Sequence, residues 1–391
     1  KQAGWNRTSV EYANRGLDTP GLPDETIAKL DAIRAHALFY VGDLAGADDS
    51  GRRADAAGRV CESFGASVMG LTARSLVAQA AGRLDDACDF ARSATDTADR
   101  VGEGAVNWHP RIWLGNAQTS TDLFDEASRT FDLGRRETER LGTRWAVPLW
   151  HYYRAALLAA WGRLDEAIAE ADAGVSTAEQ MTAFQLALPI LGALVRLSVA
   201  RDELAVASEH LEHMHRLTAN GITAAPEDVA WSEAVLLEAT AGPGVALQTL
   251  TDIYDALPRR PVLIAQDPAA AAALVRIALG AGDTARADTV VAAARRLAAS
   301  NPHVRSLAGA SAHAEGLRHR DPRLARMAVD LLRTAPRPLV LASALEDGAA
   351  VVLARGDRPT ADTWYREALE ITGSCGALRA QERLAKLIGN R

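Results

Sequence analysis

The fold is decided by a short stretch, Trp161-Gly162-Arg163-Leu164-Asp165-Glu166-Ala167. Apolar residues recur at helical spacing on both sides of it, which predicts a helix ending before Gly162 and another beginning after it. Glycine can end the first helix in a left-handed conformation at little cost. Asp165 and Glu166 place negative charge in the first turn of the next helix, where the helix dipole favours it. The stretch is therefore typical of a hinge between two antiparallel helices, and the small Ala167 lets those helices approach closely.

The same hinge recurs along the whole chain. Hinges begin at positions 42, 82, 121, 162, 201, 242, 282, 320 and 356, so the gaps between them are 40, 39, 41, 39, 41, 40, 38 and 36 residues. A regular period of this length is the signature of stacked helix pairs, each of which buries its apolar face against its neighbours. The sequence therefore predicts an all-α protein: a right-handed superhelical solenoid of about nine helix-turn-helix repeats with a period near 40 residues.

Turn-forming residues divide the chain into three predicted parts. Residues 1–23 are expected to be a lead-in segment, residues 24–374 the solenoid, and residues 375–391 a closing helix. The first repeat is expected to open with a helix from Asp24 to about Val41. Proline and glycine mark loops within the solenoid, and a change in curvature is expected at the longest of them; these loops are 220–226, 258–268 and 336–338.

The composition excludes several classes of protein. The formal net charge is −7 with no basic face, which argues against a dedicated nucleic-acid surface. The chain has 40 Arg and 3 Lys, a bias typical of a GC-rich, for example actinobacterial, genome. The three Cys residues are far apart, so no disulfide framework is expected and a reducing cytoplasm fits. No apolar run is long enough to span a bilayer, so no membrane association is expected.

The residues after several hinges resemble the tetratricopeptide repeat (TPR). Ala361, Tyr365 and Ala368 have the spacing at which that repeat places small, aromatic and small residues, and Ala127 with Phe131 matches in part. The repeats of this chain have a period near 40 residues, in place of the 34 of the TPR. Longer repeats of this kind resemble those in the sensor region of the large ATP-dependent LuxR-type transcriptional regulators, the maltose-operon-activator class. The C-terminal stretches 339–347, 365–370 and 376–380 resemble the segment that precedes the DNA-binding helices in that class.

The resemblance implies partners that this chain does not itself contain. Members of the class carry an upstream ATPase module and a downstream helix-turn-helix module, and this sequence is expected to be a piece excised from between them. No Gly-Lys dipeptide is present, so no phosphate-binding loop and no cofactor are expected here. The remaining role is to bind an effector, a small molecule or a peptide, and to relay that signal; a homo-oligomer is compatible with this role.

Aromatic residues concentrate in the third to sixth repeats and suggest where an effector binds. Trp108, Trp150 and Trp231 lie 11 to 13 residues before a hinge, while Trp145 and Phe184 lie 17 before one, which places them on the first helices of their repeats. First helices usually line the concave side of a solenoid, so these rings are expected to form a trough with a few polar groups that orient a ligand. The complete predicted ligand-binding set is Asn107, Trp108, Trp113, Asn116, Arg144, Trp145, Trp150, Tyr153, Arg154, Phe184 and Trp231.

Other interpretations stay open at this point. The Trp residues can simply fill gaps between repeats in an Ala-rich stack, and the chain can be an interaction scaffold that grips a peptide or a helix. His210, His213 and His215 mimic a metal site in spacing, but a solvated helix face explains them better, so no metal is expected. No nucleophile and base occur at a recognisable spacing, so no catalytic residues and no enzyme activity are expected.

Overall fold

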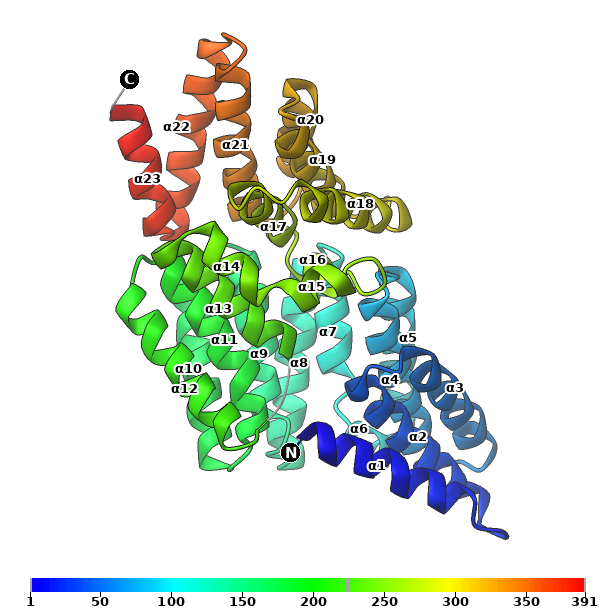
Figure 1. Ribbon diagram of the computed structural model, residues 1–391. Helices are drawn as coiled ribbons and strands as arrows, with labels where there is room; N and C mark the ends of the chain where they lie inside the picture. The colour runs from blue at the N-terminus through cyan, green and yellow to red at the C-terminus, as the bar shows by residue number, and fades with distance from the viewer. Residues whose placement is uncertain (1, 223–225, 390–391) are drawn as a thin grey trace. The chain divides into compact units, whose positions relative to one another are not determined.

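The computed structural model of the chain describes residues 2–222 and 226–389, and within these ranges all regular structure is helical (Figure 1). The described helices lie in neighbouring pairs, as the repeat predicts. The N-terminal half contains α1 (Gln2–Leu17), α2 (Asp24–Val41), α3 (Leu44–Val60), α4 (Phe64–Ala80), α5 (Leu84–Val101), α6 (Glu103–Val106), α7 (Arg111–Ser120), α8 (Phe124–Leu141), α9 (Val147–Ala160), α10 (Leu164–Gln180), α11 (Phe184–Ala200) and α12 (Leu204–Ala219).

The C-terminal half follows the same plan with shorter helices around the predicted loop at 258–268. It contains α13 (Pro226–Ala241), α14 (Pro243–Thr249), α15 (Thr251–Ala256), α16 (Val262–Gln266), α17 (Ala269–Gly280), α18 (Thr284–Ser300), α19 (Arg305–His319), α20 (Pro322–Leu332), α21 (Pro338–Leu353), α22 (Arg358–Cys375) and α23 (Leu378–Gly389). The expected lead-in is largely the helix α1, which packs on α2, and the expected closing helix is α23. The chain divides into two compact units, residues 1–153 with 218–224, and residues 154–217 with 225–391.

Every predicted hinge contains a residue with positive φ. Six of these residues are glycines, and Asp122, Asp202 and Arg320 take the same conformation with φ of 64°, 60° and 50°. A second set of positive-φ residues lies about halfway between successive hinges in the first part of the chain, at Glu62, Gly102, Gly142, Thr182 and Gly221, and Gly21 lies about half a period before the first hinge. The left-handed conformation ends a helix and reverses the chain. Many connections, both within and between helix pairs, therefore contain a residue with positive φ. The sequence pattern predicted only the connections at the hinges.

At three hinges, the aspartate that follows the hinge glycine caps the next helix. The side chains of Asp43, Asp283 and Asp357 accept hydrogen bonds from the N–H groups of Gly46, Arg286 and Thr360. These bonds satisfy donors that have no partner inside the helix. The Gly-Asp pair thus stops one helix and caps the next.

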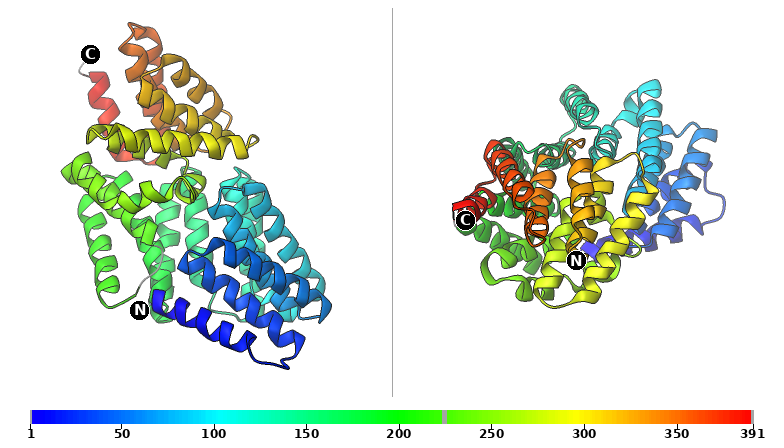
Figure 2. Two further views of the ribbon diagram at one scale, coloured as in Figure 1. Left: turned by 45° about the vertical axis from the view of Figure 1, so that its right-hand side comes forward. Right: turned by 90° about the horizontal axis from the view of Figure 1, so that it is seen from above.

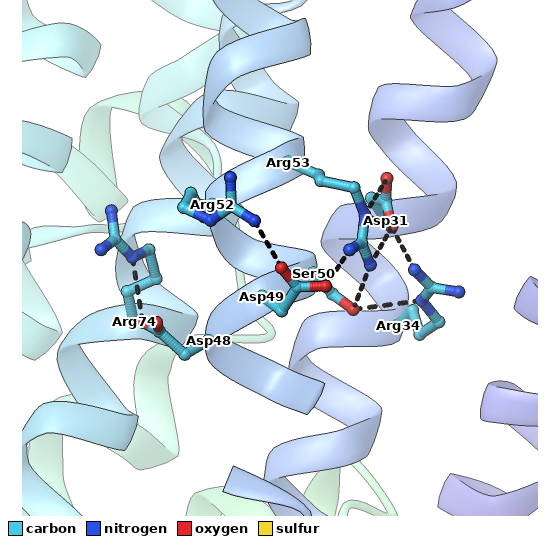
Figure 3. Close-up of polar contacts among 8 residues, drawn as sticks. All are labelled: Asp31, Arg34, Asp48, Asp49, Ser50, Arg52, Arg53 and Arg74. Atoms are coloured by element: carbon cyan, nitrogen blue, oxygen red, sulfur yellow. Dashed lines mark hydrogen bonds and ion pairs between the residues drawn. The ribbon is translucent and has the colours of Figure 1, made fainter. Parts of the chain in front are cut away.

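In the first unit, buried charge also joins successive helices (Figure 3). Asp31 on α2 is 3% exposed and accepts hydrogen bonds from Arg34 on the same helix, at 2.7 Å, and from Arg53 on α3, at 3.3 Å. Arg74 on α4 pairs with Asp48 on α3 at 3.0 Å. The guanidinium groups hold α2, α3 and α4 together, so this cluster is part of the scaffold.

In the second unit, the C-terminal helices return to the hinges of earlier pairs (Figure 1 and Figure 2). The side chain of Arg379 in α23 donates to Asp202 at 2.7 Å and to the carbonyl of Ala239 at 2.9 Å. An apolar cluster buries the same contact; its members are Leu158, Leu164, Ala167, Leu197 and Ala377. In a linear solenoid each repeat contacts only its neighbours. The contacts made by the helices after the loop at 258–268 therefore depart from the predicted solenoid.

No helix among the described residues is both long and apolar enough to cross a membrane. Cys61, Cys88 and Cys375 are free thiols.

Substitution of Gly162 tests whether the C-terminal helices pack against this hinge. Its φ is 77°, and a Cβ atom there would lie 2.6 Å from Cys375 Sγ and 2.7 Å from Pro338 Cγ. Gly282 has the same backbone, with φ of 79°, but no neighbouring atom within 4 Å. Gly282→Ala is expected to lower the free energy of unfolding by about 1 kcal/mol from backbone strain alone. Gly162→Ala should cost at least about 1 kcal/mol more because it also overpacks. Urea unfolding of both variants measures the difference, and equal losses would contradict the contact.

Candidate functional site

Two predicted aromatic residues of the first unit, Trp145 and Trp150, lie beside a buried histidine, His109, which is between α6 and α7. Its backbone has φ of 47°, and its side chain is 0% exposed. The imidazole ring lies 5.4 Å from the ring of Trp145 and 6.1 Å from that of Trp150, measured between centroids. Trp108 precedes it directly. We call the two exposed indoles, Trp108 and Trp145, together with His109, the aromatic edge.

Hydrogen bonds fix the histidine ring in one orientation. Its Nδ1 lies 3.3 Å from the hydroxyl of Thr138, and its Nε2 lies 2.8 Å from the hydroxyl of Thr143. The Thr138 hydroxyl also accepts from Trp150 Nε1 at 2.8 Å and donates to the carbonyl of Gly134 at 2.9 Å. Since that hydroxyl has already donated its proton, the neutral tautomer with a proton on Nδ1 satisfies the whole set. Burial favours the neutral ring too, because it lowers the pKa of His109 to about 4.

Glycine makes room for this arrangement. A Cβ atom at Gly134 would lie 2.1 Å from the Trp150 ring, so the indole packs directly on the backbone of α8. Pro110 follows His109 and disfavours a helical conformation for it, so α7 begins after Pro110. Sequence reasoning left His109, Thr138 and Gly134 out of the site. A histidine before a proline and a glycine inside a helix were the available signals.

The structure places Trp108 differently from the prediction. It was expected on the first helix of its repeat, but it lies in the connection before α7, because the helix cannot start until Pro110. Trp145 likewise precedes α9. The two side chains are 40% and 43% exposed, and the polar residues next to them, Asn107 and Arg144, are exposed as well. Four predicted residues thus lie together in the loops that enter two consecutive helix pairs.

Three other predicted residues of the first unit, Trp113, Asn116 and Trp150, lie in the packed interior, and Tyr153 is half-buried. Trp150 is 2% exposed and Trp113 is 8% exposed, and the ring of Trp113 meets that of Tyr153 edge-on with 5.8 Å between centroids. Asn116 is 7% exposed, and its amide donates to the side chain of Gln79 at 2.7 Å. These side chains fill space and satisfy one another between helix pairs, as the packing interpretation of the aromatic residues predicts.

The three remaining predicted residues belong to the second unit. Arg154 forms an ion pair with Glu170 at 2.9 Å, and Phe184 is the first, half-buried residue of α11. Trp231 in α13 is 4% exposed, and its Nε1 has no hydrogen-bond partner within the ranges that the structure describes.

The second unit contains a buried charged cluster that the sequence did not indicate. One carboxylate oxygen of Asp347 on α21 accepts from Arg276 on α17 at 2.5 Å and lies 2.8 Å from His313 Nε2 on α19. Burial alone would raise the pKa of Asp347, but Arg276 and His313 hold it well below its usual range. A cavity of about 10 Å³ lies beside the pair, at the lower limit for one water molecule. The hydroxyl of Ser343 on α21 also accepts from Arg276, at 3.1 Å.

The three histidines of α12 point to different partners. His213 lies 3.3 Å from Glu179, and His215 lies 3.6 Å from Glu233. Burial lowers the pKa of His210. No group of three metal-ligating side chains converges within the described part of the chain.

The sequence matches no protein-family model and no curated protein.

The contacts of Asp347 predict that its removal lowers the free energy of unfolding much more than removal of the adjacent Glu346. Asp347→Ala removes the shared acceptor and leaves Arg276 and the buried His313 without it, so we expect a loss of about 3 kcal/mol of unfolding free energy. Glu346 pairs with Arg383, which is 52% exposed, so Glu346→Ala should cost about 1 kcal/mol or less. Chemical denaturation measures both values. Similar losses would show that Asp347 does not brace the three helices.

His109 predicts acid sensitivity. The unfolded chain takes up a proton on this ring below its ordinary pKa of 6.5, whereas the folded chain does so only near pH 4. Stability is therefore lost as the pH falls from about 6.5 to about 4, by about 3 kcal/mol from this residue. His109→Gln should lower stability at pH 7 but flatten this acid dependence by that amount. Unfolding free energies at several pH values check it, and parallel curves for both proteins would refute the prediction.

Proposed function

We propose that this chain is the effector-sensing region of a LuxR-type ATP-dependent transcriptional regulator, and that the effector binds at the aromatic edge. The observation that carries the proposal is the exposure of Trp108 and Trp145 in the loops that enter two consecutive helix pairs, with the buried ring of His109 5.4 Å from that of Trp145. Large exposed indoles are costly to keep in water, and aromatic residues with a few polar neighbours are typical of binding sites. The proposal includes a right-handed superhelix of about nine TPR-like repeats as the scaffold.

Binding at this edge provides a route for the signal. Trp108 leads into α7 and Trp145 leads into α9, so a ligand that contacts both joins two consecutive helix pairs. Such a ligand binds most tightly to one angle between those pairs and shifts the population toward it. The flanking ATPase and DNA-binding modules of the parent regulator would respond to that shift.

A peptide-binding scaffold is the second candidate, and polar residues at matching positions are what it requires. Asn116, Arg196 and Arg276 each lie six residues before the positive-φ residue of their hinge. All three side chains are engaged by neighbouring helices, through Gln79, Ser232 and Asp347 respectively. These bonds leave them poorly placed to hold a peptide, so the sensor role is better supported.

A binding experiment tests the proposal. A thermal-shift screen with a panel of metabolites identifies ligands, and calorimetric titration then compares the wild type with the double variant Trp108→Ala, Trp145→Ala. We expect the double variant to bind at least about tenfold more weakly, since both stacking surfaces are gone. Tyr40→Ala is the matched control, because this ring on α2 is 56% exposed and lies outside the aromatic edge. Equal binding by all three proteins, or no ligand in the panel, would overturn the proposal.

A further inference from the structure

The helices of the second unit form a closed circuit of contacts. From α11 the packing passes through α13, α14, α17, α19, α21 and α22 to α23, and α23 packs on α11 again. A stack of helix pairs in which each pair contacts only its neighbours does not close in this way. We call the contact that closes the circuit the clasp. Its residues are Gly162, Asp202 and Ala239 on one side and Cys375, Ala377 and Arg379 on the other.

The charged part of the clasp depends on one side chain. Arg379 on α23 donates to Asp202 at 2.7 Å and to a carbonyl at the end of α13 at 2.9 Å. The two side chains of this ion pair are 30% and 34% exposed, so water and salt screen their attraction. Arg383 on the same helix forms its hydrogen bonds with Glu346 of α21, and Glu238 on α13 attracts it more weakly. The clasp therefore gains most of its charge stabilisation from Arg379.

The apolar part of the clasp is small on its C-terminal side. Its cluster takes four buried residues from α9, α10 and α11 and receives the small Ala377 and the partly buried Leu339 from the other side; the four are Leu158, Leu164, Ala167 and Leu197. Leu384 of α23, in contrast, is fully buried in a larger cluster with side chains of α20, α21 and α22. Since buried apolar area drives packing, α23 is held more firmly by the C-terminal helices than by the hinge at Asp202.

The packing beside the loop at 258–268 provides a pivot for movement. Tyr254 on α15 is 2% exposed, and its hydroxyl donates to the carbonyl of Leu274 on α17 at 2.8 Å, so this contact flanks the loop in the sequence. The buried cluster at Asp347 joins α17, α19 and α21, and the helices from α17 to α23 therefore form one body. That body is fixed firmly near the loop and weakly at the clasp, and local opening begins where contacts are weakest.

We infer that the clasp opens reversibly, with the helices from α17 to α23 moving as one body about the loop at 258–268 while every helix stays folded. Opening would expose part of the leucine cluster and release α23 from the hinge at Asp202. The closed and open states therefore present different surfaces to a partner, which makes the clasp a conformational switch of this unit. The inference does not rest on the effector site, because that site lies in the first unit.

The native thiol of Cys375 measures the opening. Cys375 is 9% exposed and packs on Gly162 in the clasp, whereas Cys88, at 6% exposure, is packed between helices of the first unit. The rate at which each thiol reacts with N-ethylmaleimide, divided by its rate in the unfolded chain, reports how often its surroundings open. Mass spectrometry of the labelled peptides separates the two thiols. We expect Cys375 to react at least about tenfold faster than Cys88.

Substitutions on both sides of the clasp test its role. Arg379→Gln and Asp202→Asn should each raise the Cys375 rate about fivefold, since each removes an ion pair that only the closed state contains. Asparagine at position 202 tolerates the positive φ of that residue. Arg383→Gln is the matched control on the same helix, because Glu346, its hydrogen-bond partner, moves with it, and it should change the Cys375 rate less than about twofold. All three variants should leave the Cys88 rate unchanged.

Three results would overturn the inference. Equal normalised rates for Cys375 and Cys88 would show that the clasp opens no more often than a packed interior. An increase with Arg379→Gln but none with Asp202→Asn would show a local loosening where α22 meets α23, without release from the hinge. An increase with Arg383→Gln as large as with Arg379→Gln would show that α23 detaches by itself, which contradicts movement of the C-terminal helices as one body.

Discussion

A left-handed backbone residue at each hinge is the constraint on which the structure depends. Helices of the lengths found here, at most 18 residues, gain most of their stability from packing an apolar face against a neighbour. A positive-φ residue reverses the chain within a few residues, so consecutive helices can pack side by side. Where glycine is absent, as at Asp122, Asp202 and Arg320, the backbone adopts the same conformation. Packing of the helix pair must therefore outweigh the local cost, which is about 1 kcal/mol or more for a residue with a side chain.

The second unit shows how a repeat protein acquires long-range contacts. The loop at 258–268 contains the short helix α16, and beyond it α23 and the adjoining ends of α21 and α22 pack against hinges that lie far earlier in the sequence. Arg379 supplies charge to the carbonyl end of α13 and to the hinge at Asp202, where the helix dipole favours a cation. A contact between residues 177 apart ties the C-terminal helix to the middle of the unit, so the unit is more than a sum of nearest-neighbour interactions.

In the first unit, the buried residues of the candidate site hold its backbone in place, and its exposed indoles are the surface proposed to bind an effector. Buried hydrogen bonds around His109 hold a strained backbone in place, and such strain persists only where the surroundings determine it fully. Trp150 and Trp113 provide the packing, while Trp108 and Trp145 remain available on the surface. A rigid support beneath exposed aromatic rings limits the entropy that a ligand must lose on binding, which is consistent with the proposed role.

The sequence by itself determined the helix pairs, the positions of the hinges, the extent of α2 and the presence of a closing helix, which was expected over residues 375–391 and is α23 (Leu378–Gly389). These depend on local signals, namely glycine, the Asp that follows it, and apolar spacing within one helix. Only the tertiary structure decided which aromatic rings are buried. Trp108 and Trp150 have nearly the same distance to their hinges, yet Pro110 removes Trp108 from its helix and Gly134 admits Trp150 to the interior. The cluster at Asp347 and the return of α23 join residues from distant repeats. A periodic sequence pattern does not predict such contacts, because it describes only each helix pair and its immediate neighbours.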